Sequence, residues 1–142
     1  MAEVVLLDTG PLVALADRSE EFHQWAASQL HRMHAPMVTC GAVLAEAGFV
    51  VRQHPLALAR MRRLLERGNI ISMEENQEIW LRAISLMERY ANVPMSFADA
   101  CLIAMTEITP GARVFTLDRD FLIYRQDGEK PIALLAPFAQ EV

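Results

Sequence analysis

Four carboxylic acids stand beside apolar segments of this chain, and their types and placement point most directly to chemistry. They are Asp8, Glu46, Asp99 and Asp118. An ionised carboxylate beside a protein core is unfavourable unless it is paired or binds a cation, because burial removes its hydration. Carboxylate oxygens are hard ligands that suit Mg²⁺ or Mn²⁺. If the fold brings these acids together, their mutual repulsion predicts a metal site.

The first of these acids also has two other interpretations. With Thr9 and Gly10 it follows an apolar run, which fits a strand-to-helix turn whose Asp side chain caps the helix. The same Asp-Thr-Gly tripeptide occurs in the catalytic loops of aspartic proteases, which are mostly β proteins. Helical patterns dominate this chain, and Pro11 suits the first turn of a helix. The protease interpretation is therefore disfavoured.

The remaining acids have structural alternatives too. Asp99 lies three residues after Ser96, which is the spacing of a capping box. Asp118 and Asp120 share a segment that favours a turn. Glu46 is harder to explain structurally, since helical spacing puts its carboxylate at the border of an apolar face, although a solvated edge position is the alternative. One shared site explains all of these acids together.

Short apolar runs alternate with helical patterns, and this arrangement would position the acids. Strand-like runs occupy residues 3–7, 37–39, 69–72, 113–116 and 132–135. Helical patterns occupy residues 10–17, 19–33, 41–53, 56–67, 75–90 and 96–107. We therefore expect an α/β fold in three α/β/α layers, with a short central parallel sheet of four to five strands. Asp8 and Asp118 follow two of these strands, and ligands bind at the carboxyl ends of such sheets.

The composition fits one globular domain over residues 1–142. The chain is 53% hydrophobic and 22% charged with a net charge of −5, which argues against disorder and against a general nucleic-acid coat protein. No apolar stretch is long enough to span a bilayer, and Asp8 interrupts the apolar start that a secretory signal would need. Cys40 and Cys101 lack metal-ligand spacing, so we interpret them as buried thiols of a cytoplasmic protein.

Arginines are concentrated within residues 52–67. On a helix, Arg60, Arg63 and Arg67 share one side. A solvated helix face is one interpretation, and contact with an RNA backbone or an acidic partner is the other. The histidines are scattered over helical segments and favour surface or interface roles over metal binding.

Taken together, these motifs resemble the PIN domain family, and most closely the VapC-type toxin ribonucleases of toxin–antitoxin systems. The resemblance is carried by Asp8-Thr9 after the first strand, Glu46 on a mid-chain helix, Ser-Phe-Ala-Asp-Ala at residues 96–100 and Thr-Leu-Asp-Arg-Asp-Phe at residues 116–121. It extends over essentially the whole chain. One departure is Gly10, where the family often has Asn or Ser.

The resemblance implies roles for individual residues. The catalytic, metal-binding acids would be Asp8, Glu46, Asp99 and Asp118, with Asp120 ranked behind them as a ligand or a neighbour of the ligands. Thr9, Ser96 and Thr116 would shape the site. One or two Mg²⁺ or Mn²⁺ ions would activate a water that cleaves RNA and leaves 5′-phosphate and 3′-hydroxyl ends.

The resemblance also implies a homodimer and a cognate antitoxin. Apolar residues Phe22, Trp25, Ala26 and Leu30 could supply an interface or belong to the core. The alternatives are a non-catalytic PIN-like binding or dimerisation module and a stand-alone PIN nuclease without an antitoxin. A structure-specific DNA nuclease is disfavoured, because the chain is too short for the additional DNA-anchoring elements of such enzymes.

Overall fold

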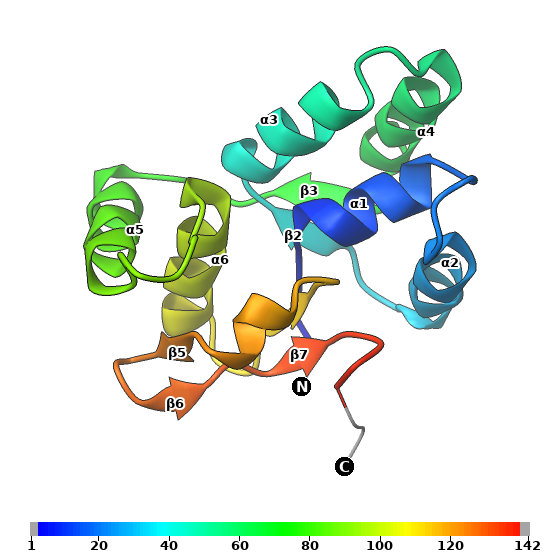
Figure 1. The fold of residues 1–142 in the computed structure, drawn as a ribbon. Coiled ribbons are helices and arrows are strands. Elements are labelled where there is room, and N and C mark those ends of the chain that lie inside the picture. The colour runs from blue at the N-terminus through cyan, green and yellow to red at the C-terminus, as the bar shows by residue number, and fades with distance from the viewer. Residues whose placement is uncertain (1–2, 140–142) are drawn as a thin grey trace.

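A central five-stranded parallel sheet organises the computed structural model, which describes residues 3–139 (Figure 1). Its strand order is β3-β2-β1-β4-β7, and every neighbouring pair is parallel. The strands are β1 (Val5–Leu7), β2 (Met37–Thr39), β3 (Ile70–Ser72), β4 (Arg113–Phe115) and β7 (Leu134–Leu135). The predicted parallel sheet of four to five strands is confirmed.

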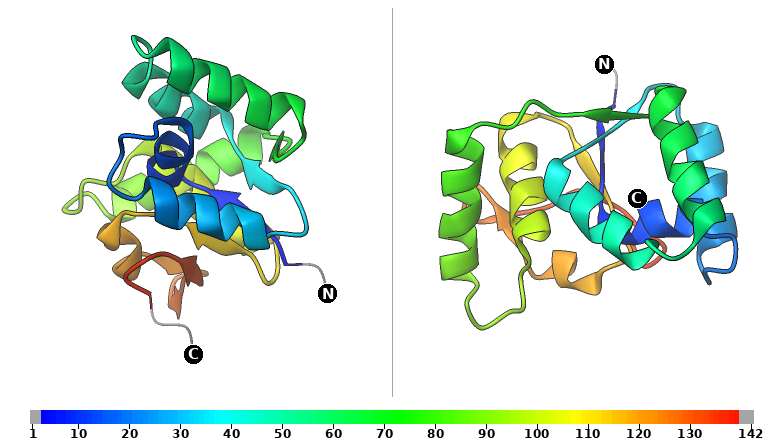
Figure 2. Two further views of the ribbon diagram at one scale, coloured as in Figure 1. Left: turned by 90° about the vertical axis from the view of Figure 1, so that its right-hand side faces the viewer. Right: turned by 90° about the horizontal axis from the view of Figure 1, so that it is seen from above.

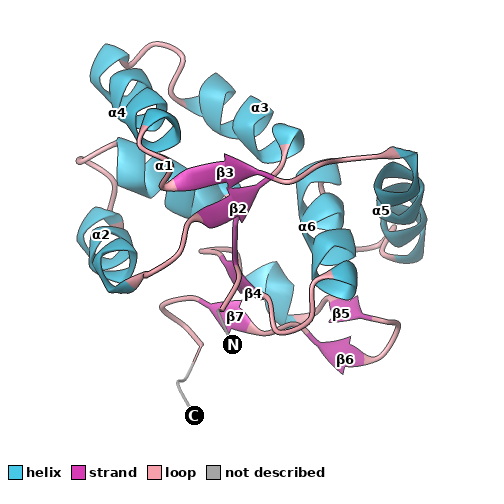
Figure 3. Cartoon of the chain, turned by 180° about the vertical axis from the view of Figure 1, so that it is seen from behind, coloured by secondary structure: helices cyan, strands magenta, loops and turns pink. Residues whose placement is uncertain are grey.

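Helices flank this sheet on both sides. They are α1 (Thr9–Ala16), α2 (His23–Arg32), α3 (Gly41–Val50), α4 (Pro55–Glu66), α5 (Gln77–Arg89) and α6 (Phe97–Ile108). Helices α1, α2 and α4 lie on one side and α5 and α6 on the other, as Figures 1 and 3 show. Helix α3 packs against both α1 and α6. It thereby connects the two helical layers, and the view from above in Figure 2 shows it lying between them.

Burial on both faces explains the apolar strands and the apolar sixth helix. All three residues of β1 are buried, as the centre of a doubly covered sheet requires. Residues 98–106 of α6 are also all buried, so this part of the helix is covered around its whole circumference, and most of its residues are apolar. Asp99 is the one carboxylate within that buried stretch, where it is 7% exposed.

The apolar stripe of the second helix belongs to the core. Ala26 is fully buried, and Phe22, Trp25 and Leu30 pack against the core while partly exposed. The Trp25 ring meets Phe115 of β4 edge-on, with ring centroids 5.5 Å apart. Of the two interpretations of this stripe, the structure favours the core.

Two local features differ from the expectation. Helix α2 begins at His23 and not at Ser19, because Asp17 Oδ1 accepts hydrogen bonds from the backbone nitrogen and hydroxyl of Ser19 and stabilises a turn there. A 3₁₀ helix η1 (Arg119–Leu122) and an antiparallel hairpin of β5 (Arg125–Gln126) and β6 (Lys130–Pro131) were not expected.

The two cysteines are buried free thiols, as predicted. Cys40 immediately precedes α3, and Cys101 lies on α6. In the described part of the chain, residues 3–139, we find no helix with the length and hydrophobicity needed to cross a membrane.

Candidate active site

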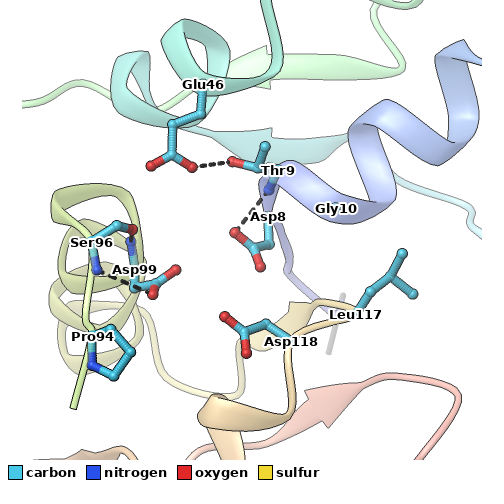
Figure 4. Close-up of a pocket in the computed structure, with 9 residues that line it drawn as sticks. All are labelled: Asp8, Thr9, Gly10, Glu46, Pro94, Ser96, Asp99, Leu117 and Asp118. Carbon is cyan, nitrogen blue, oxygen red and sulfur yellow. Dashed lines mark hydrogen bonds between the residues drawn. The ribbon is translucent and has the colours of Figure 1, made fainter. Parts of the chain in front are cut away.

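A cavity of about 400 Å³ opens at the carboxyl end of the sheet, and all four predicted acids line it (Figure 4). Its walls also contain hydroxyl and small apolar residues. The complete lining is Asp8, Thr9, Gly10, Glu46, Pro94, Ser96, Asp99, Leu117 and Asp118. The fold thus gathers carboxylates from four distant parts of the sequence.

Asp8 is held rigidly at the end of β1. It caps α1, since its Oδ1 accepts a hydrogen bond of 2.8 Å from the Thr9 backbone nitrogen. Its Oδ2 accepts a hydrogen bond of 2.7 Å from the Thr116 hydroxyl. Asp8 is only 5% exposed. The helix-cap interpretation and the site interpretation of this residue are therefore both compatible with the structure.

Asp118 lies in the turn after β4 and is fixed through the same threonine. Its backbone nitrogen donates to Thr116 Oγ1 at 2.9 Å. Its Oδ1 accepts a hydrogen bond of 2.9 Å from the Asp120 backbone nitrogen, so Asp118 caps η1. Thr116 therefore connects two of the acids with one hydroxyl.

Asp99 forms the predicted capping box with Ser96 at the start of α6. The Asp99 nitrogen donates to Ser96 Oγ at 3.0 Å, and the Ser96 nitrogen donates to Asp99 Oδ2 at 3.3 Å. The Tyr124 hydroxyl donates to the same Oδ2 at 3.3 Å. Tyr124 was not predicted from the sequence, because nothing local marks an aromatic residue beyond the Asp118 turn as a neighbour of Asp99.

Glu46 reaches the cavity from α3 as a solvent-exposed residue. Its Oε2 accepts a hydrogen bond of 2.9 Å from the Thr9 hydroxyl (Figure 4). Val43 and Ala47 on the same helix are buried, so Glu46 stands at the border between the core and solvent. Thr9 therefore ties the Glu46 side chain to the beginning of α1.

The cavity disfavours additional negative charge. Burial, followed by repulsion from Asp118 and Glu46, raises the pKa of Asp8 to about 6, although hydrogen bonds from Thr116 and Thr9 oppose the shift. Burial and repulsion from Asp8 and Asp118 raise the pKa of Asp99 to about 7. Two carboxyls with pKa values near neutrality indicate a site whose negative charge is not balanced by protein cations.

Comparison with known proteins identifies the family. The family model for the PIN domain matches residues 5–126. The chain belongs to the PIN domain family. No curated protein sequence matches the chain.

Two solved structures show the same fold as this PIN domain. VapC20 of Mycobacterium tuberculosis, a toxin that cleaves the sarcin–ricin loop, superimposes with a TM-score of 0.72 at 18% identity, over 82% of this chain and 91% of VapC20. VapBC2 of Rickettsia felis, bound to a DNA fragment from its promoter, gives a TM-score of 0.63 at 14% identity, over 94% of this chain and 98% of the matched chain.

The donor atoms of the PIN domain cavity fit a hard divalent cation. All four acids offer carboxylate oxygens, with hydroxyls of Thr9 and Ser96 beside them. Among residues 3–139, however, no three His, Cys, Asp or Glu side chains stand close enough together to enclose a metal ion by themselves. Mg²⁺ commonly binds one or two carboxylates and keeps several waters, so this donor set suits such an ion without a closed cage.

Two further positions of the PIN domain site, Asp120 and Gly10, lie at its margins. Asp120 is half-buried in η1 and is not among the residues that line the cavity. At Gly10, an added Cβ would lie 3.3 Å from Leu117 Cβ, so a larger residue would press against this wall of the cavity. Close packing by Leu117 is a physical reason for glycine at this position.

The three arginines predicted to contact RNA lie apart from the acids. Arg60, Arg63 and Arg67 line a second cavity of about 160 Å³ with His23 and the apolar residues Leu15, Ala27, Leu30 and Leu64. Arg60 Nη1 donates to the carbonyl of Ala16, at the C-terminal end of α1. Asp8 lies at the other end of this eight-residue helix, about 12 Å away along its axis.

Proposed function

We propose that this PIN domain is a Mg²⁺- or Mn²⁺-dependent endoribonuclease and the toxin of a toxin–antitoxin pair. The observation that carries this proposal is the convergence of Asp8, Glu46, Asp99 and Asp118 on one cavity. The fold that the chain shares with VapC20, a toxin that cleaves the sarcin–ricin loop, supports RNA as the substrate.

The four acids would hold one or two divalent ions. When bound, such an ion supplies a water of lowered pKa and neutralises charge on a scissile phosphate. The protein's own contribution is to keep the ligands in place: Thr116 holds Asp8, and Ser96 holds Asp99. Asp120 would act from outside the cavity by fixing Asp118 through its backbone nitrogen.

A carboxylate of the cavity that the bound ion leaves partly free would accept the proton of the attacking water. Attack of water on phosphorus with departure of the ribose 3′-oxygen would leave a 5′-phosphate and a 3′-hydroxyl. We further propose that Arg60, Arg63 and Arg67 contact the RNA backbone beyond the cleaved bond, since no carboxylate of residues 3–139 lines their cavity.

We also propose two protein partners, a cognate antitoxin and a second copy of this chain. The similarity to VapBC2, a complex bound to its promoter DNA, supports a cognate antitoxin. Exposed apolar residues on α5 support a homodimer, because Trp80, Leu81 and Ile84 are 49%, 60% and 48% exposed. We place the protein in the cytoplasm, where its RNA substrate would be found.

A non-catalytic PIN-like binding or dimerisation module is the alternative, and so is a stand-alone nuclease without an antitoxin. The exposed apolar face of α5 would serve a dimerisation module equally well. The complete set of acids favours the enzyme, because a binding module has no need for buried carboxyls that repel one another.

Product analysis tests the proposal. The purified protein is incubated with a 5′-labelled structured RNA in Mg²⁺, in Mn²⁺ or in EDTA, and the new ends are identified. We expect internal cleavage only with metal and ligatable 5′-phosphate ends. Products with 2′,3′-cyclic phosphate ends would contradict the proposed attack by water, and metal-independent cleavage would contradict the role of the acids.

A further inference from the structure

Tyr124 is a buried residue that no sequence motif connects with the candidate site. It follows η1, and its side chain is fully buried. Its hydroxyl donates to Asp99 Oδ2 at 3.3 Å. A buried hydroxyl requires a hydrogen-bond partner, and here the partner is one of the acids that line the cavity.

An aromatic cluster fixes the Tyr124 ring. Tyr90, the residue that follows α5, and Phe121 of η1 both meet this ring edge-on, with centroids 5.3 Å and 5.2 Å away. Such edge-to-face contacts favour one ring orientation. The Tyr90 hydroxyl faces a different group, since it accepts a hydrogen bond of 2.9 Å from the Arg125 backbone nitrogen.

The hydrogen bonds of Asp99 are distributed unevenly over its two carboxylate oxygens. Those from the Ser96 nitrogen and the Tyr124 hydroxyl both end on Oδ2. Within residues 3–139, Oδ1 has no such bond and is available to the cavity, where Figure 4 shows the carboxylate turned towards Asp8 and Asp118. A carboxylate oxygen that accepts two hydrogen bonds restricts the rotation of the carboxylate more than an oxygen that accepts one.

We propose that Tyr124 is a positioning residue, which holds Asp99 Oδ2 so that Oδ1 faces the shared cavity. Because Tyr124 and Phe121 adjoin the turn that carries Asp118, the aromatic cluster also fixes the position of Asp99 relative to Asp118. This inference rests on the proposed function for its consequence in catalysis. The structural part of the inference, the orientation of Asp99, can be tested separately.

Tyr124→Phe and Tyr90→Phe form a matched pair of variants. Each removes one hydroxyl from the same aromatic cluster and keeps the ring, but only Tyr124 contacts an acid of the cavity. Both variants are compared with the wild-type protein by thermal unfolding, by kcat and KM for RNA cleavage, and by calorimetric titration with Mn²⁺ in the absence of RNA. The Asp99 side chain is examined in a crystal structure of Tyr124→Phe.

We expect Tyr124→Phe to lower kcat about tenfold and to weaken Mn²⁺ binding, as loss of a hydrogen bond to a charged group would do, while KM for RNA stays unchanged. Tyr90→Phe should keep the wild-type kcat and Mn²⁺ affinity. Equal losses in both variants would overturn the proposal. Activity would then depend on the packing of the aromatic cluster and not on the hydrogen bond to Asp99. Wild-type kcat and Mn²⁺ affinity in Tyr124→Phe would overturn it as well.

The crystal structure separates this inference from the proposed function. If the wild-type protein cleaves no RNA with any metal, the proposed function fails. The role of Tyr124 is then decided by Asp99 alone: a rotated carboxylate in Tyr124→Phe supports positioning, and an unchanged carboxylate overturns it.

Discussion

The Thr116 hydroxyl donates a hydrogen bond of 2.7 Å to Asp8 Oδ2, although the two residues are 108 positions apart in the chain. Strands β1 and β4 are parallel neighbours with Leu7 paired to Phe115, so the residues that follow them lie side by side. The same hydroxyl accepts a hydrogen bond from the Asp118 nitrogen. One side chain therefore sets the relative positions of two acids of the cavity.

Replacing Thr116 with Val should impair both stability and activity. Valine has nearly the same shape, but it leaves buried Asp8 Oδ2 and the Asp118 nitrogen without their partner. We expect the free energy of unfolding to fall by about 1–3 kcal/mol and RNA cleavage to fall at least about tenfold. Urea denaturation and single-turnover cleavage measure the two effects.

Thr116→Ser is the control for this prediction. Serine keeps the hydroxyl, so cleavage should return to near the wild-type rate even if some packing is lost. If Thr116→Ser loses as much activity as Thr116→Val, the retained hydroxyl is not sufficient for activity, and this result would contradict the assignment of the loss to the hydrogen bond.

The metal-free protein should respond to pH through Asp8 and Asp99. Their pKa values in the folded protein are about 6 and about 7, against an ordinary value of 3.8. Between about pH 4 and pH 7 the folded state therefore binds more protons than the unfolded state, and these two groups make stability fall as pH rises. Their contribution is most favourable below pH 4 and is lost above pH 7.

Asp99→Asn isolates this effect from the other titrating groups. We expect the variant to gain about 1–3 kcal/mol relative to the wild type between pH 4.5 and pH 7.5 in EDTA, which is several degrees in Tm. Added Mg²⁺ should recover more stability in the wild type than in the variant. Parallel pH profiles for the two proteins would contradict the raised pKa of Asp99, which burial and repulsion from Asp8 together cause.

RNA binding by the cavity that Arg60, Arg63 and Arg67 line can be tested with variants of two neighbouring residues of α4. Both are exposed, but only Arg63 of the two lines the cavity, whereas Arg62 pairs with Glu66 at 3.4 Å. If RNA phosphates bind in the cavity, Arg63→Gln should weaken RNA binding and lower the slope of log affinity against log salt by about 0.7 for each phosphate that is no longer neutralised. Fluorescence anisotropy with RNA in EDTA measures binding without cleavage.

Arg62→Gln removes the same charge from the same helix and should leave the salt slope unchanged. Equal effects of the two variants would indicate only a general electrostatic attraction. No effect of Arg63→Gln would favour a solvated helix face, which is the alternative interpretation of these arginines.

Much of the fold follows from local sequence signals. Residues 37–39 form the strand that was predicted, because burial on both faces demands a short continuous apolar run. The predicted start of α2 was wrong, because the Asp17 side chain stabilises a turn that competes with the first helical turn.

The hairpin of β5 and β6 illustrates what local signals leave out. Its turn was expected at Asp127-Gly128, where both residues have positive φ, but the strands on either side were not. Tertiary contacts hold this hairpin: Glu107 of α6 accepts a hydrogen bond from the Asp127 nitrogen, and Arg89 of α5 donates to the Gly128 carbonyl. Such contacts leave no local pattern in the sequence.

The candidate site likewise has features that local sequence signals mark and features that they do not. Asp8, Asp99 and Asp118 are marked by a strand end, a capping box and a turn, and these signals located them. The hydrogen bond between Thr9 and Glu46 and the one between Tyr124 and Asp99 join separate elements. Neither could be predicted before the helices were placed in space.

The central claim is that the converging acids support metal-dependent cleavage of RNA. Single-turnover cleavage by the wild-type protein and by Asp8→Asn, in Mn²⁺ and in EDTA, tests it most directly. Asparagine can keep the helix cap of α1 through its side-chain oxygen, so circular dichroism and Tm should show a folded variant. We predict cleavage by the wild type in Mn²⁺, none in EDTA, and a loss of at least about a thousandfold in folded Asp8→Asn, as expected when a group of the catalytic centre is removed. Full activity of folded Asp8→Asn would contradict the claim.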